Sequence, residues 1–113
     1  MTNADIVRAC FESYVNQDRD TAESLIARNF VFTSPQDDHI DRAAFFERCF
    51  PTAGRLRTQE LLHVVPTDGD DVFVLYEYEL HTGERHRNVE VLTVRNGKVA
   101  ETQVFFGGRV SYA

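Results

Sequence analysis

The 113-residue sequence contains no tryptophan, one methionine, three prolines and two cysteines. Two cysteines, Cys10 and Cys49, are too few for a disulfide framework and lack the spacing of a zinc site, so we expect reduced, buried thiols and no metal ion. No apolar run approaches the ~20 residues of a transmembrane helix, and the segment after Met1 lacks the apolar stretch of a signal peptide. These absences favour a cytoplasmic protein with no membrane partner.

Positive charge is also scarce. Twelve basic residues face eighteen acidic ones, which leaves a net charge of −6. The basic residues are mostly arginines scattered along the sequence, whereas nucleic-acid binding requires a clustered basic surface, so we expect no nucleic-acid partner. A chain of this length, 42% hydrophobic and 27% charged, predicts one ordinary domain spanning residues 1–113.

The first half of the chain is predicted to be mainly helical. Apolar side chains recur there at the i, i+4 spacing of amphipathic helices, and side chains suited to N-caps precede them. The expected helices span residues 3–17, capped by Asn3; a short segment that starts at Asp20 and ends by Arg28; and residues 42–50, capped by Asp41.

Strands are predicted around and after the third helix. Residues 30–33 form a short expected strand that Pro35 ends, and residues 36–39 form a polar loop. Long strands joined by tight turns are expected at 57–65, 72–81, 86–95 and 98–106, and Asn96-Gly97 is a strong hairpin signal between the last two. Helices followed by a run of strands indicate the α+β class.

Several short segments carry a resemblance to a known family: Cys10 to Asn16, Phe30 to Pro35, Ile40 to Arg42, and Asn96 to Val99 before Phe105-Phe106. In order and spacing they resemble the nuclear transport factor 2-like superfamily, in particular its SnoaL-like branch, which includes polyketide cyclases and is related to ketosteroid isomerase. The resemblance covers essentially the whole chain. It implies a cone-shaped roll in which a curved, mainly antiparallel sheet wraps around three helices.

The resemblance also implies a conical pocket between sheet and helices, dimerisation through the outer face of the sheet, and no cofactor. Its members include isomerases, cyclases, hydrolases, dehydratases and non-catalytic binding domains, so fold alone does not assign an activity. The general base of ketosteroid isomerase immediately precedes the proline after the first strand, and Ser34 occupies that position here. The best match for the proton-donating acid of the isomerase is Glu90.

Counting outward from a two-residue turn at Thr82-Gly83 predicts the partners of the central hairpin. Residues two apart share a face, and the face that combines apolar with a few polar residues is the favoured pocket wall. That face is expected to carry Phe73, Leu75, Glu77, Asn88, Glu90 and Leu92.

On this face we expect Glu77 and Glu90 to form a catalytic carboxyl pair, because proximity and desolvation would raise one pKa and let one act as acid and the other as base. Asn88 would orient a carbonyl group or water. Two alternatives remain: the carboxylates lie in solvent without a role, or they line a pocket that binds without catalysis. Alternation alone does not decide which face lines the pocket.

Four further residues are candidates for ligand contact: Tyr14 on the first helix, Phe32 in the first strand, His39 near the expected pocket mouth, and Phe106 in the last strand. A two-residue Asn96-Gly97 turn would place Phe105 on the face of Glu90, whereas a three-residue turn would place Phe106 there. Comparison with the isomerase favours Phe106.

The function expected from these residues is binding of a small apolar or weakly polar ligand, with cofactor-free isomerisation, cyclisation or dehydration by proton transfer as the associated chemistry. The alternative is a non-catalytic dimeric accessory or ligand-binding module. In either case, both faces of the sheet are too apolar to be left in water, so we expect a homodimer through the outer face.

Overall fold

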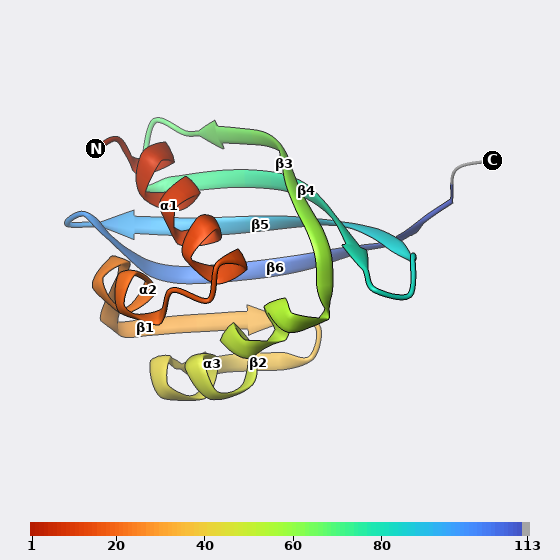
Figure 1. The fold of residues 1–113 in the computed structure, drawn as a ribbon. Helices are drawn as coiled ribbons and strands as arrows, with labels where there is room; N and C mark the ends of the chain where they lie inside the picture. Colours follow the sequence, from red (N-terminus) through yellow and green to blue (C-terminus); the bar gives the residue numbers. More distant parts are fainter. Residues whose placement is uncertain (112–113) are drawn as a thin grey trace.

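A curved six-stranded sheet forms the body of the computed structural model, which describes residues 1–111 (Figure 1). The strand order is β2-β1-β6-β5-β4-β3, and every neighbouring pair is antiparallel except β1 and β6, which are parallel. The helices lie on one face, here called the inner face, and the α+β prediction is confirmed. The elements are α1 (Asn3–Val15), α2 (Arg19–Leu25), β1 (Ile26–Ser34), β2 (Asp37–Asp41), α3 (Arg42–Arg48), the 3-10 helix η1 (Phe50–Arg55), β3 (Leu56–Pro66), β4 (Asp71–Leu80), β5 (Arg85–Arg95) and β6 (Lys98–Val110).

The helix starts differ from the sequence prediction by one or two residues. Thr2, not Asn3, caps α1: its Oγ1 accepts from the Asp5 amide at 3.1 Å, and the Asp5 carboxylate accepts from the Thr2 amide at 3.0 Å. Asp18, not Asp20, caps α2 by accepting from the Thr21 amide. The predicted cap of α3 by Asp41 is confirmed.

The strands β1 and β2 were only partly predicted. β1 begins at Ile26, where the sequence pattern favoured the end of a helix, and the expected polar loop contains the strand β2. β2 pairs with β1 through Val31 and Asp41 and through Phe32 and Ile40. Its polar composition fits an edge strand, one side of which has no partner strand in the described sheet.

The core lies between the inner face and the helices. Val7 of α1 and three sheet valines, Val72, Val74 and Val99, have no exposed surface. Phe11 of α1 packs edge-on against Tyr76 of β4, with ring centroids 5.3 Å apart. These contacts hold α1 across the sheet (Figure 1). Within the described part of the chain, no helix has the length and apolarity needed to cross a membrane.

The connection between β4 and β5 has three residues, not the predicted two. The Leu80 amide donates to the Glu84 carbonyl, and Gly83 adopts a left-handed conformation with φ of +92° between them. Asn88 therefore pairs with Tyr76, and Glu90 pairs with Val74. Because of this one-residue shift, each β4 side chain lies on the opposite face of the sheet from the one predicted relative to the β5 side chains.

The β5–β6 hairpin combines parts of both predicted alternatives. Asn96 and Gly97, with φ of +53° and +75°, form a two-residue turn between Arg95 and Lys98. The register then shifts by one residue beyond the pair of Val94 and Val99, so Phe106 pairs with Asn88. Phe106, not Phe105, consequently shares the face of Glu90, as the isomerase comparison favours.

A second irregularity in the β5–β6 pairing requires a glycine. Between the pairs His86–Arg109 and Asn88–Phe106, β6 contains one more residue than β5. A Cβ atom added at Gly107 would lie 2.4 Å from the backbone carbonyl oxygen of Arg87. Neighbouring strands therefore approach too closely here for any side chain.

We expect Gly107→Ala to lower the free energy of unfolding by about 1 to 3 kcal/mol, because the added methyl group overpacks two backbones that cannot separate easily. Gly54→Ala is the matched control, since its added Cβ meets no atom within 4 Å. Urea denaturation of both variants measures the difference. Equal effects of the two substitutions would contradict the close approach at Gly107.

Candidate functional site

Four polar side chains form a row on the inner face, here called the polar strip: Tyr76 and Tyr78 of β4, and Asn88 and Glu90 of β5. The Asn88 Nδ2 donates to the Tyr76 hydroxyl at 3.1 Å. Tyr78 and Glu90 lie beside this pair, near enough that Asn88 lowers the pKa of Tyr78 and Tyr76 lowers the pKa of Glu90, each against a larger rise caused by burial. The strip thus brings four interacting polar side chains together on the inner face.

Among the carboxyl groups in and around the strip, that of Glu90 has the pKa furthest from its ordinary value. Burial raises the pKa of its carboxyl from 4.5 to about 7, and the Tyr76 hydrogen bond only partly opposes that rise. Within residues 1–111 no basic side chain forms an ion pair with Glu90. The residue as a whole is partly exposed.

The helices place further polar groups around the strip. The Tyr14 hydroxyl of α1 lies 2.7 Å from Thr52 Oγ1 of η1, and its pKa is raised by burial and by the nearby Glu90. Burial also raises the pKa of Tyr76. Both phenols therefore stay protonated at neutral pH and can donate hydrogen bonds.

The two thiols are free, as predicted, and remain protonated at neutral pH. Burial, followed by the charge of Glu90, raises the pKa of Cys10 to about 12. Burial and the adjacent Asp37 raise the pKa of Cys49 to about 11. A thiol that is not ionised is a weak nucleophile, so neither cysteine has the acidity of a catalytic one.

The predicted carboxyl pair is wrong. Glu77 lies on the outer face, where its carboxylate accepts from Arg87 Nε at 3.0 Å and Arg85 Nη1 at 3.3 Å. Glu90 lies on the inner face, so the sheet separates the two carboxyl groups. The three-residue turn is the physical reason, because it moves the odd-numbered side chains of β4 away from the face of Glu90.

The same shift moves Phe73 and Leu75 out of the predicted pocket wall. Phe73 is 43% exposed on the outer face. Asn88 and Leu92 do lie on the inner face, Leu92 as a buried core residue. Val74 and Tyr76, which the predicted register assigned to the opposite face, take the places expected for Leu75 and Glu77, and Tyr78 lies opposite His86. Gly83, which favours a left-handed three-residue connection, was the signal for this register.

The remaining candidates differ in their relation to the strip. Phe32 is buried in the core against Phe45, and Phe106 is 49% exposed beside Asn88. His39 is exposed on β2, which β1 and β6 separate from β5, and its Nδ1 lies 2.6 Å from Asp38 Oδ1. The structure therefore does not bring His39 to Glu90.

Ser34, at the position of the isomerase base, organises the turn after β1. Its Oγ accepts hydrogen bonds from the amides of Gln36 and Asp37, each at 3.1 Å. Its hydroxyl also lies 3.3 Å from the Asp37 carboxylate. These contacts are those of a turn residue. Across residues 1–111, no three His, Cys, Asp or Glu side chains gather as metal ligands would.

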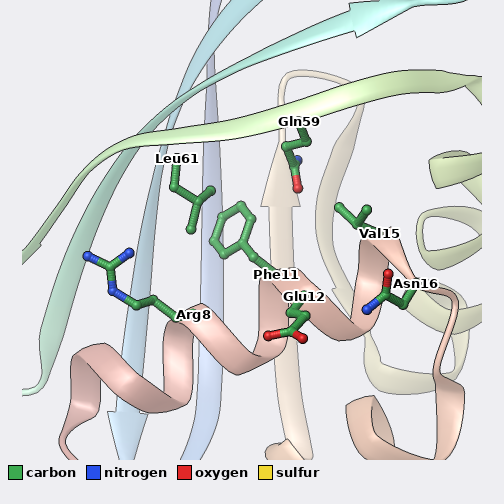
Figure 2. A pocket seen from close by; sticks show the side chains of 7 residues that line it. All are labelled: Arg8, Phe11, Glu12, Val15, Asn16, Gln59 and Leu61. Carbon is green, nitrogen blue, oxygen red and sulfur yellow. The ribbon is translucent and has the colours of Figure 1, made fainter.

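The surface of residues 1–111 has hollows of about 400 Å³ and about 350 Å³, and neither of these two is lined by Glu90. The larger, about 400 Å³, lies between α1 and β3, and its lining combines apolar with charged and amide side chains (Figure 2). Phe11 projects from α1 toward Leu61 of β3 in this groove and also contacts Tyr76. The Phe11 ring therefore lies between the groove and the polar strip.

Comparisons with known proteins agree with this architecture. The SnoaL-like domain profile matches residues 7–102, and the chain belongs to the SnoaL-like domain family. No curated protein matches the sequence.

Solved structures with the same fold include proteins of several descriptions. A Burkholderia xenovorans NTF2-like protein of unknown function superposes with a TM-score of 0.80 at 17% identity, covering 98% of this chain and 87% of its own. A Kribbella flavida protein provisionally called a ketosteroid isomerase superposes with a TM-score of 0.77 at 17% identity, and the match covers 98% of this chain and 82% of the Kribbella protein. A Sinorhizobium meliloti protein provisionally called a polyketide cyclase superposes with a TM-score of 0.76 at 20% identity, and the match covers 88% of this chain and 93% of the Sinorhizobium protein. These likenesses establish the NTF2-like fold.

The raised pKa of Glu90 predicts a pH-dependent stability. Below pH 4.5 the carboxyl is protonated in both the folded and the unfolded state; between 4.5 and about 7 only the folded state holds the proton against ionisation. The titration of Glu90 therefore lowers the free energy of unfolding by up to about 3 kcal/mol as the pH rises from 4.5 to about 7, and it causes no loss of stability at lower pH.

Glu90→Gln removes this titration, so its stability relative to the native protein should increase from pH 4.5 to pH 7.5. Urea denaturation of both proteins across that range tests the expectation. A stability difference that does not change with pH would show that the folded carboxyl titrates normally.

Proposed function

We propose that the polar strip binds a small, weakly polar carbonyl compound and that Glu90 transfers a proton on it without a cofactor. One observation carries this proposal: the Glu90 carboxyl has a pKa raised to about 7 by burial, lies on the inner face beside Tyr76 and Asn88, and has no ion pair with a basic side chain of residues 1–111. Near neutral pH such a group is present in both protonation states. It is therefore suited to both the acid and the base half of a proton transfer.

The proposed reaction is isomerisation of a β,γ-unsaturated ketone. The Glu90 carboxylate removes the α-proton, the electron pair moves onto the carbonyl oxygen as an enolate, and the same proton returns to the γ-carbon. No oxidant, reductant or second substrate is consumed. The protonated hydroxyls of Tyr14 and Tyr76 are the groups available to donate to the enolate oxygen.

Aldol-type cyclisation and dehydration use the same first step, removal of a proton next to a carbonyl group. Relatives in the same fold that are provisionally called an isomerase and a cyclase support this reaction class. The partial exposure of Glu90 and the exposed Phe106 ring beside Asn88 indicate approach of the ligand from that end of the strip.

The test uses cyclohex-3-enone as a probe, whose conversion to the conjugated enone is followed by ultraviolet absorbance. We expect Glu90→Gln to lower kcat/KM by at least about a hundredfold, the size typical of a lost general acid–base group. With Glu90 as the base, native kcat/KM should rise as the pH increases through about 7.

Glu77→Gln is the matched control, because it makes the same chemical change on the outer face. It should leave kcat/KM within about twofold while lowering stability, since two arginines lose a charged partner. Activity lost equally in both variants, or retained in Glu90→Gln, would contradict the assignment. Binding of the probe without turnover would favour a ligand-binding module instead.

We further propose a homodimer through the outer face of the sheet, which is the basis of the alternative function as an accessory module. Side chains of four adjacent strands form a continuous apolar surface there, with Val65, Phe73 and Phe105 each 43% to 54% exposed. The half-buried residues between them are Leu75, Val89 and Val91. A contiguous apolar patch of this kind is typical of an interaction surface.

Sedimentation at micromolar concentration should therefore give a dimer, and Phe105→Glu should give a monomer, because it places a charge in the apolar surface. Val15→Glu is the control, since Val15 is 46% exposed on α1, on the other face of the sheet. A monomeric native protein would contradict the proposed dimer. So would dissociation by both substitutions alike.

A further inference from the structure

The smaller of the two hollows has an unusual charge for this protein. It has a volume of about 350 Å³, lies where α2, β1 and α3 meet (Figure 1), and is lined by Arg19, Arg28, Asp41, Arg42, Ala43 and Phe46. We call it the arginine hollow. Three of the arginines of a chain with net charge −6 surround this one space.

Two of the guanidinium groups are held in place around a buried aromatic ring. The Cζ atoms of Arg19 and Arg42 lie 5.0 Å and 5.1 Å from the centroid of Phe46. Arg42 Nη2 also donates to the Glu23 carbonyl at 2.9 Å, and Arg19 Nε donates to the Glu23 carboxylate at 3.2 Å. The site therefore needs little reordering of these side chains to bind a ligand.

The fold leaves part of this positive charge uncompensated. Within residues 1–111, Arg28 is exposed and its side chain makes no hydrogen bond or ion pair, and Arg42 Nε is buried without a hydrogen-bond partner. Asp41 is the one acidic residue in the lining, and its carboxylate already accepts from the Ala44 amide at 2.9 Å. Like charges gathered around one space repel each other, and a bound anion relieves that repulsion.

We propose that the arginine hollow binds a phosphate group, either inorganic phosphate or the phosphate of a small organic ester. Guanidinium groups recognise phosphate through paired, charge-assisted hydrogen bonds, and an anion balances the excess of three arginines over the carboxylates of Asp41 and Glu23. The volume of the hollow accommodates a phosphate with a small organic substituent. This site lies outside the polar strip and is independent of the proton-transfer proposal.

Isothermal titration calorimetry at constant ionic strength tests the proposal with inorganic phosphate, phenyl phosphate and acetate. Saturable 1:1 phosphate binding is expected, and Arg28→Gln should weaken it by at least tenfold, because one charge-assisted contact is removed. Arg28 has no partner in the described fold, so the melting temperature of this variant should be unchanged.

Arg55→Gln is the matched control. Arg55 is also exposed, its side chain has no hydrogen bond or ion pair to the described residues, and it lies outside the lining, so the variant has the same net charge as Arg28→Gln. It should bind phosphate within twofold of the native protein. Equal weakening in both variants would reveal non-specific attraction, and the absence of saturable binding would overturn the proposal. Acetate binding as tight as phosphate binding would overturn the phosphate assignment, and tighter binding of phenyl phosphate than of inorganic phosphate would identify an ester as the ligand.

Discussion

The handedness of one glycine determines the chemistry available inside this domain. Gly83 adopts a left-handed conformation in the three-residue connection between β4 and β5, and that connection sets their pairing. Because side chains alternate between faces, the pairing decides which partners Glu90 receives. Glu90 shares its face with Tyr76 and Asn88, whereas Glu77 lies on the other face. Glu90 is thereby spared the electrostatic repulsion of a second carboxylate.

Glu77 and Glu90 show how strongly the two faces of one sheet differ. Glu77 is only 8% exposed, but its carboxylate forms ion pairs with two arginines, which neutralise its negative charge. Glu90 has no such cation among the described residues, and the low-polarity interior favours its neutral form. The same type of side chain is thus a charged ion-pair partner on one face of the sheet and is favoured in its neutral form on the other. A count of acidic residues would not distinguish them.

The sequence predicted the architecture more fully than the site, for physical reasons. Helical spacing, the Asp41 cap and the Asn96-Gly97 turn are local signals, and each appears in the structure. β2 has no local signal of a strand, because its polar residues become a strand only through pairing with β1. The resemblance to ketosteroid isomerase pointed to Glu90, but the face on which Tyr76 lies depends on the length of the β4–β5 connection, which has three residues with Gly83 in the left-handed conformation and not the predicted two.

The position of β6 within the sheet has a consequence for how the chain reaches its native state. This strand follows the other five in the sequence, yet it lies between β1 and β5 and hydrogen-bonds to both. During synthesis, β1 and β2 leave the ribosome before β6, so β1 lacks its neighbour in the sheet until β6 has been synthesised. Its parallel pairing with β1 closes a loop that includes most of the sequence, which makes that closure a slow, late step of assembly.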